Sequence, residues 1–435
     1  MSLTYIRLFI SIVILIHEID ARHRSYYGTK APYKVPVSSS HVPKEFELVC
    51  SQMIVRHGCR TLKTVDFDRL TMMLWNQAKN ENALTDYGRQ FGEDIQDFMT
   101  ITDRIGREQL SKLGKREQKN LAHRLSKRFE HILRNSSRKI RLVSSGLPRT
   151  QTSLHAFATG MPLDAASLFI YENPNPNLLL FNPSSTKRHQ RFHSTLESIR
   201  IQPLSKRMAY KFLRRLYKPS FIRRLAHGHY NIVDHDLKQS IENEIDAASA
   251  HHAVLLNTAS LREDGVRPLL EKYFSPDEQQ WFTYLYDAKK YYQSGPSFYN
   301  QTISFDNAQV LLDDFVLHAE ECSRTTAKHF LRARFGHAET IIPFAALLQI
   351  PILSDKQTFI NDTFTYENNA WRGEILSPLS ANIQWEIYRY ENILVRMLLN
   401  EYPVPFKRQC RPYSERHHLF YSFDELKRCY RRQKS

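Results

Sequence analysis

The stretch that decides the fold occupies residues 48–60 and reads Leu48-Val49-Cys50-Ser51-Gln52-Met53-Ile54-Val55-Arg56-His57-Gly58-Cys59-Arg60. Its first eight residues form a short, mainly apolar run, which predicts a buried strand. Two arginines and a histidine follow at once, and Gly58 permits a tight turn among them. The stretch therefore predicts a strand that ends in a compact, positively charged loop.

The chemistry of this loop follows from its side chains. The guanidinium groups of Arg56 and Arg60 offer planar forks of N–H donors that fit two oxygens of a phosphate, and they stay charged at physiological pH. An imidazole held among them, that of His57, can attack a bound phosphorus atom and carry the phosphoryl group as a covalent intermediate. The alternative is structural: the arginines form surface ion pairs and His57 is a hydrogen-bonded residue at a strand end.

Two other segments repeat the pattern of a strand followed by polar residues. Residues 330–335 read as a short strand after a helical stretch at 315–329, and Gly336-His337-Ala338-Glu339-Thr340 follows. Glu339 could protonate a leaving oxygen and then activate water. In an extended segment His337 and Glu339 would share one side, whereas at a helix start they would fan out. Residues 139–143 alternate as a strand and lead to Arg149, which is either a third phosphate ligand or a solvated arginine at a helix start.

Three strand ends that carry polar loops predict an α/β sheet with its site at the carboxyl ends of the strands. Helical patterns separate the strands at 111–133 and 311–328. Between 164 and 295 apolar residues recur at helical spacing, around Leu204-Met208-Phe212-Leu216 and Ile241-Ile245, and the loop at 173–177 marks where this region begins. We expect a core of residues 22–163 and 323–409, an inserted helical cap at 164–322, and a carboxyl-terminal tail at 410–435.

Charge and termini suggest partners and compartment. The chain of 435 residues carries a formal charge of +16, which favours polyanions as ligands. Basic clusters occur at 187–191, 211–215, 223–224 and 431–434; we expect most to be solvated and at most one of the first three to border the site. No nucleic-acid-binding module accompanies them. Residues 1–21 have a basic residue and a short apolar run, as in a secretory signal peptide, so we expect secretion or a lumenal location without stable membrane insertion.

Cysteines and asparagines fit that compartment. Three Asn-x-Ser/Thr sites begin at Asn135, Asn300 and Asn361. Of the five cysteines, Cys410 and Cys429 are expected to close a carboxyl-terminal loop, whereas Cys50, Cys59 and Cys322 cannot be paired from the sequence.

Together the Arg-His-Gly-x-Arg loop, Arg149 after a Ser-Ser pair, and the His-Ala-Glu tripeptide resemble the histidine phosphatase superfamily, in its acid phosphatase and phytase branch. His-Ala-Glu, where the common acid phosphatases and phytases carry His-Asp, resembles the multiple inositol polyphosphate phosphatases. Further similarity lies at 26–33, 109–114, 336–348 and 364–392. The resemblance spans about 24–405 in islands and is loose between 161 and 323.

This resemblance implies a sheet flanked by helices, with an inserted, mainly helical cap. It makes His57 the nucleophile, Glu339 the proton donor, and Arg56, Arg60, Arg149 and His337 the ligands of the phosphate. No metal or other cofactor is implied, and the partner is a small polyanionic phosphate: inositol polyphosphates such as phytate, or 2,3-bisphosphoglycerate. Two alternatives remain, a general acid phosphatase and a polyanion-binding relative with weakened catalysis.

Two departures from the family pattern concern the loop itself. Thr61-Leu62 replaces the usual Tyr-Pro after Arg60, so the proline that would stiffen the loop exit is missing, and the sequence leaves the rigidity of this exit open. Cys59 places a thiol beside the proposed nucleophile, either as a small apolar side chain or as a redox group, and the structural role is favoured.

Overall fold

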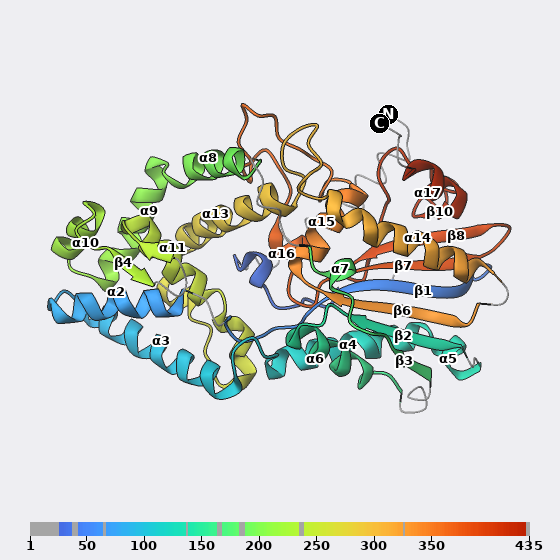
Figure 1. Cartoon of the computed structure of the whole chain (residues 1–435), viewed down its shortest axis with the longest axis horizontal. Helices are drawn as coiled ribbons and strands as arrows, with labels where there is room; N and C mark the ends of the chain where they lie inside the picture. The colour runs from blue at the N-terminus through green and yellow to red at the C-terminus, as the bar shows by residue number, and fades with distance from the viewer. Residues whose placement is uncertain are drawn as a thin grey trace.

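The computed structural model describes residues 26–36, 42–63, 67–135, 138–162, 168–181, 188–234, 239–324 and 327–431 (Figure 1). The expected signal peptide lies outside the described residues. The same holds for Lys187, for the side chains of residues 188–191 and for residues 432–435, which belong to two of the predicted basic clusters.

An eight-stranded mixed sheet forms the centre of the fold, in the order β10-β8-β7-β1-β6-β2-β3, with β9 paired to β8. Strands β1, β6, β2 and β3 run parallel, and β7, β8, β9 and β10 continue the sheet antiparallel. Its strands are β1 (Glu47–Arg56), β2 (Lys139–Ser144), β3 (Phe169–Tyr171), β6 (His329–Gly336), β7 (Asn382–Arg389), β8 (Ile393–Leu399), β9 (Tyr402–Val404) and β10 (Phe420–Ser422).

The three predicted strands are confirmed as β1, β2 and β6, and so is the predicted α/β class. The helical expectations need correction at their ends. The pattern at 111–133 forms two helices, α4 (Lys112–Arg128) and α5 (Glu130–Asn135). The predicted helix reaching 328 or 329 is wrong beyond α14 (Gln309–Ser323), because β6 already begins at His329, which pairs with Lys139 of β2. Pairing in the sheet overrides the local helical pattern there.

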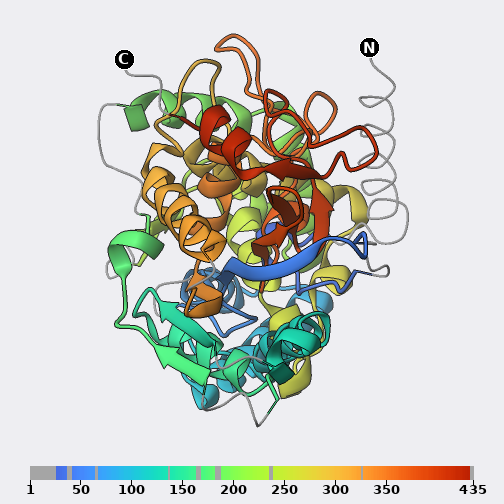
Figure 2. The same cartoon turned by 90° about the vertical axis from the view of Figure 1, so that its right-hand side faces the viewer.

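Helices cover both faces of the sheet. Side chains of β1 alternate between the two layers: Met53 and Val55 pack in the cluster with α4 and α6 (Pro148–Ala158), and Ile54 packs in the cluster with α14 and α15 (Ala338–Leu348). In Figure 1 the helix α14 is drawn across β7 and β8, whereas α4 and α6 lie beside β2 and β3; in Figure 2 the orange helices of the first set and the teal helices of the second set lie apart, with the blue strand β1 between them. Both faces of β1 are therefore buried, as its apolar run predicts.

A second group of helices gathers at the far end of the molecule around its own apolar cluster (Figure 1). Its members are α2 (Asp68–Asn80), α3 (Asp86–Ile105), α9 (Pro203–Leu216), α10 (Pro219–Ala226), α11 (Glu244–Leu255), η3 (Thr258–Asp264), α12 (Leu270–Tyr273) and α13 (Pro276–Ser294). The helical spacing from Leu204 to Leu216 is confirmed as α9. Ile241, in contrast, belongs to β5 (Gln239–Ile241), which pairs with β4 (Ile232–Asp234).

The predicted domain bounds stay a prediction. Helices α2 and α3 lie within the range expected for the core, yet they pack with α9 and α11. Strand β3 lies within the range expected for the cap, yet it pairs with β2; three residues are too few to show an alternating pattern. The remaining helices are η1 (Gly28–Lys30), α7 (Pro176–Leu179), α8 (Arg188–Arg200), η4 (Asp306–Ala308), α16 (Gly373–Leu376) and α17 (Phe423–Cys429).

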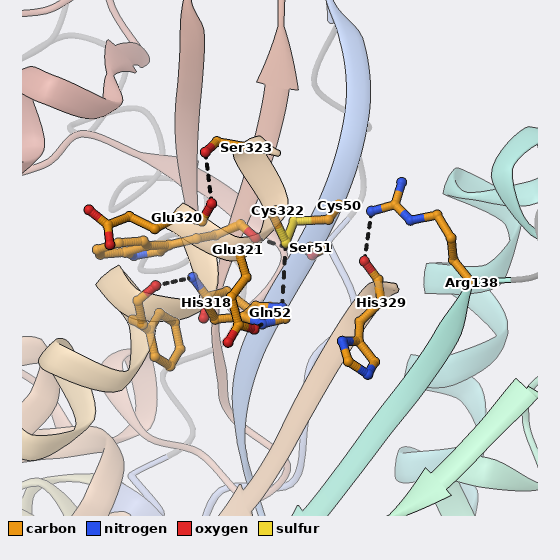
Figure 3. Close-up of a disulfide and its surroundings, with 12 residues drawn as sticks. Cys50, Ser51, Gln52, Arg138, His318, Glu320, Glu321, Cys322, Ser323 and His329 are labelled. Carbon is orange, nitrogen blue, oxygen red and sulfur yellow. Dashed lines mark hydrogen bonds and ion pairs between the residues drawn. A yellow bond between two sulfur atoms is a disulfide. The ribbon is translucent and has the colours of Figure 1, made fainter. Parts of the chain in front are cut away.

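Two disulfides tie these layers together. The predicted bond between Cys410 and Cys429 is confirmed. The second joins Cys50 of β1 to Cys322 of α14, and His318 lies beside it (Figure 3). Cys59 is the free cysteine. Among the described residues, no helix combines the length and the apolar character that a membrane span requires.

Candidate active site

The predicted site residues lie at or beyond the carboxyl ends of three neighbouring parallel strands, β1, β6 and β2. The register pairs Arg56 of β1 with Gly336 of β6, and Ser144 of β2 with Phe335 of β6. The three strands therefore end side by side, and the loops that follow them begin next to one another. His57 and His337 are the residues that follow β1 and β6, and their rings lie 5.6 Å apart between centroids. The sequence patterns that looked separate are thus brought together.

The hydrogen bonds of His57 define its tautomer. Its Nδ1 lies 3.0 Å from the carbonyl oxygen of Gly58, which can only accept, so Nδ1 carries the hydrogen and Nε2 keeps its lone pair. Burial, followed by the charges of Arg56 and Arg60, holds the pKa of His57 well below its usual range. The imidazole is therefore neutral near neutral pH, which is the state a nucleophile requires.

The three predicted arginines are all buried, and each is held to the scaffold by one end of its guanidinium group. Nη1 of Arg56 donates to the carbonyl oxygens of Thr29 and Ser377, at 2.5 and 2.6 Å. The other two arginines bond similarly: Nη1 of Arg60 donates to the Thr61 carbonyl at 2.6 Å, and Nη1 of Arg149 to Glu108 at 2.6 Å.

The Nε donor of each guanidinium group makes no such bond to the scaffold within the described residues. The Nε atoms of Arg56, Arg60 and Arg149 are buried and have no hydrogen-bond partner among the residues that the structure describes. Buried polar groups normally find partners, and unpartnered donors of three cations suit an anion with several oxygens. Burial lowers the pKa of Arg56 to about 10, which still leaves it charged at neutral pH.

His337 is fixed by a chain of hydroxyl groups. Thr150 Oγ1 donates to the Leu147 carbonyl, so it accepts from Ser145 Oγ at 3.0 Å, and Ser145 in turn accepts from Nε2 of His337 at 2.8 Å. Nδ1 of His337 is buried and finds no partner within the described part of the chain. Because Nε2 carries the hydrogen, Nδ1 keeps its lone pair, so it can accept a hydrogen bond or take up a proton but donates none in this tautomer.

Glu339 lies in the first turn of α15, which His337 precedes as the N-cap residue. The tripeptide thus occupies a helix start, the arrangement in which the two side chains fan out. Glu339 Oε1 accepts a hydrogen bond of 2.6 Å from Nζ of Lys290 on α13. Lys290 is the main reason that the pKa of Glu339 lies well below its usual range, and Arg56 adds to the effect.

Two buried residues of α4 hold the loop from behind, and sequence reasoning missed both. The carboxylate of Glu117 accepts hydrogen bonds from the backbone N–H groups of Tyr33 and Cys59, at 2.9 and 3.0 Å. It also accepts from the hydroxyl of Ser380 at 2.9 Å. Gln118 donates to the Arg56 carbonyl at 2.9 Å. A glutamate facing the apolar side of an amphipathic helix was the available signal.

The loop exit is braced despite the missing proline. Backbone N–H of Thr61 donates to the Gln109 carbonyl at 3.0 Å, and its hydroxyl donates to the Gly106 carbonyl at 2.7 Å. The N–H of Glu108 donates to the Leu62 carbonyl at 2.9 Å. These hydrogen bonds restrain the backbone at the position where the proline ring would otherwise do so.

Cys59 and Gly58 have structural roles in the loop. The Cys59 thiol is fully buried and donates to Glu117 at 3.2 Å; burial and this carboxylate raise its pKa well above the usual range, which keeps it protonated. Gly58 approaches helix α4 rather than a ligand, because a Cβ there would lie 2.5 Å from the Gly114 carbonyl oxygen.

The predicted basic clusters make ion pairs in the helical group. Lys211 pairs with Asp277 at 2.6 Å, and Arg215 donates to Glu278 at 2.9 Å. The lysines whose charges interact with Glu339 are Lys290 and Lys63, which the sequence did not single out. Helix packing, not local clustering of charge, selects the cations at the site.

The group of possible metal ligands among the described residues does not include His57 or Glu339. In the described part of the chain, one set of three possible ligands meets the distance requirement, and it consists of Cys50, Cys322 and His318. Both sulfur atoms are already bonded to each other in the disulfide (Figure 3).

The chain is similar to known proteins in sequence and in fold. The chain is 22% identical to multiple inositol polyphosphate phosphatase 1 of Homo sapiens, over 93% of this chain and 86% of that protein. It superimposes on the multiple inositol polyphosphate phosphatase of Bifidobacterium longum in complex with inositol hexasulfate with a TM-score of 0.83, at 24% identity, over 93% of this chain and 97% of the other. It also superimposes on the phytase of D. castellii, with a TM-score of 0.67 and 15% identity, over 93% and 84% of the two chains.

The family assignment rests on a longer match than any single motif. The profile of the histidine phosphatase superfamily (branch 2) matches residues 47–400, which run from the start of β1 to the residue after β8. That range contains all three loops, and the resemblance drawn from the motifs is confirmed. The chain belongs to the histidine phosphatase superfamily, branch 2, and is a phosphatase of the histidine type.

Proposed function

We propose that this protein removes phosphate groups from inositol polyphosphates, phytate and its lower forms, through a phosphohistidine intermediate. The observation that carries the proposal is the set of three buried arginines, arranged around a neutral His57, whose Nε donors have no hydrogen-bond partner in the part of the chain that the structure describes. Phosphoryl transfer depends mainly on positioning and on positive charge around the phosphate oxygens. The names of the relatives, which include inositol polyphosphate phosphatases and a phytase, support the substrate class.

The proposed reaction has two steps. Nε2 of His57 attacks phosphorus, the bond from phosphorus to the ester oxygen breaks, and Glu339 gives its proton to the leaving oxygen. The Glu339 carboxylate then takes a proton from water, whose oxygen attacks the phosphohistidine and releases inorganic phosphate. Arg56, Arg60 and Arg149 would hold the phosphate oxygens through both steps, and His337 would donate to one of them once Nδ1 has taken up a proton brought with the phosphate.

A secretory location belongs to the same proposal. Both disulfides suit an oxidising compartment, and the asparagines of two glycosylation motifs, Asn300 and Asn361, are exposed. 2,3-bisphosphoglycerate is a further proposed substrate, because it too is a compact polyanionic phosphate ester.

The test is phosphate release from phytate by the purified protein, with 2,3-bisphosphoglycerate and an aryl phosphate as comparison substrates. His57→Ala should abolish release, whereas the exposed His227→Ala is the matched control and should retain it. Release from the aryl ester alone would move the assignment to a general acid phosphatase. A folded protein that binds phytate without turnover would instead be a binding relative.

A further inference from the structure

The contact between Lys290 and Glu339 joins two helices at the site. Lys290 belongs to α13, which contributes Phe282 to the cluster of the far helices and Ala288 and Tyr291 to the cluster on the sheet, and Glu339 belongs to α15, which packs in that second cluster. Their side chains are 49 positions apart in sequence and meet at 2.6 Å. The side chains of Lys290 and Glu339 are 18% and 36% exposed, so solvent or a ligand can still reach both.

Other charged groups face Glu339 from every neighbouring element. They are Arg56 and Lys63 from β1 and the loop that follows it, Arg149 from α6, His337 before α15, and Lys290 from α13. Of these, Lys290 is the one with a hydrogen bond to the carboxylate within the described residues, and it has the largest effect in lowering the pKa of Glu339.

This contact opposes the chemistry proposed for Glu339. A general acid must carry a proton when the ester oxygen leaves, yet a carboxylate bonded to an ammonium group stays ionised. A phosphate ester brings negative charge into the same region and offers oxygens that compete for the ammonium group. Substrate is therefore the agent that can separate Lys290 from Glu339.

We propose that Lys290 is a positioning residue for Glu339: it holds the carboxylate ionised while the site is empty and exchanges it for a substrate phosphate oxygen. Glu339 then takes a proton from solvent and delivers it to the leaving oxygen. Helix α13 thereby makes the acid available only when a phosphate ester is bound. This inference rests on the proposed function, because it concerns the same proton transfer.

The test compares pH profiles, because kcat/KM reports the free enzyme and kcat reports the bound complex. In the wild-type protein, the alkaline limb of kcat for phytate should lie at higher pH than that of kcat/KM. Lys290→Met should move the kcat/KM limb upward by about 1 pH unit or more, since removal of an adjacent opposite charge raises a carboxyl pKa by that order. Lys290→Arg should restore the wild-type limb.

Two controls separate this role from a general effect on folding. Lys289→Met removes the neighbouring lysine of α13 and should leave both limbs in place. An aryl phosphate with a good leaving group requires little protonation, so its profile should not move in Lys290→Met. Where Lys290→Met fails to fold, Lys290→Gln replaces it in the same comparison.

An unmoved limb in a folded Lys290 variant overturns the inference while the wild-type activity on phytate still stands. An equal shift in Lys289→Met, or with the aryl ester, overturns it as well. A wild-type protein inactive on both esters refutes the proposed function, and the inference with it.

Discussion

Glu117 is expected to hold the loop that carries His57, and its replacement gives a graded prediction. One carboxylate oxygen accepts from the Tyr33 N–H and the Cys59 thiol, and the other from the Cys59 N–H and the Ser380 hydroxyl. Glu117→Gln keeps one oxygen. In either orientation of the amide, its NH2 group replaces one carboxylate oxygen. The backbone N–H that bonded this oxygen then has no acceptor, whereas the thiol or hydroxyl beside it can rotate and accept a hydrogen bond from the NH2 group. Glu117→Leu removes both oxygens.

The magnitudes follow from this count. A hydrogen bond to a charged group contributes about 1.5 to 3 kcal/mol, so Glu117→Gln should lower the free energy of unfolding by about 2 kcal/mol. Glu117→Leu leaves both backbone N–H groups unpaired and should lower it by about 4 kcal/mol. Because the Cys59 N–H is then free, the loop shifts, and a displacement of about 1 Å can reduce activity by about 100-fold. Denaturant unfolding and kcat/KM for phosphate release measure the two effects.

The matched control is Arg124→Met on the same helix. Arg124 bonds Glu401 at 2.6 and 2.9 Å, and breaking such a pair costs about 3 kcal/mol without contact to the loop. Glu117→Leu should therefore lose far more activity than Arg124→Met at comparable loss of stability. Equal activity in the two variants, assayed well below both melting temperatures, would refute the reasoning.

Three further changes test other parts of the structure. In Gly114→Ala the new Cβ would lie 2.0 Å from the Cys59 carbonyl oxygen, so the melting temperature and the activity should both fall, with a cost of about 3 kcal/mol. Burial lowers the pKa of His251 to about 3, so the unfolded state binds a proton that the folded state excludes between pH 6.5 and 3; this residue should add about 1.4 kcal/mol per pH unit to the loss of stability in acid, and His251→Gln should reduce the slope of unfolding free energy against pH by that amount. Replacing Cys50 and Cys322 by serine opens a crosslink that spans 272 residues, and calorimetry should show a loss of about 3 to 5 kcal/mol.

The sequence predicts the strands that carry the site because β1 is a short, mainly apolar run and the apolar residues of β2 alternate with polar ones. The sequence does not predict that both faces of β7 are buried, because one face of this strand is made of polar side chains. In the structure that face is buried as well: Gln384 donates to Ser51, and Glu386 pairs with Arg396 at 2.5 Å. Polar side chains satisfied by neighbouring strands look the same in a sequence as side chains exposed to water.

Some residues of the site can be predicted from the sequence, and others cannot. His57, Arg60 and His337 are recognisable because they lie in short motifs next to predicted strands. Lys290 stands in an ordinary helical pattern, and only the packing of α13 against α15 brings it to Glu339. A contact between residues so far apart depends on how two groups of helices dock, and a local pattern contains no information about docking.

Preorganisation explains why the arginines are buried even though burial disfavours their charge. Arg56 and Arg60 each use Nη1 to bond backbone carbonyl oxygens, which fixes the guanidinium plane before any ligand arrives. A flexible, solvated arginine would lose side-chain entropy and hydration on binding. Here the folding of the sheet and of α4 supplies that ordering, so positive charge is already in place when phosphate oxygens develop charge during transfer. The fold therefore bears the cost of holding three cations together, and the proposed phosphate ligand would relieve it.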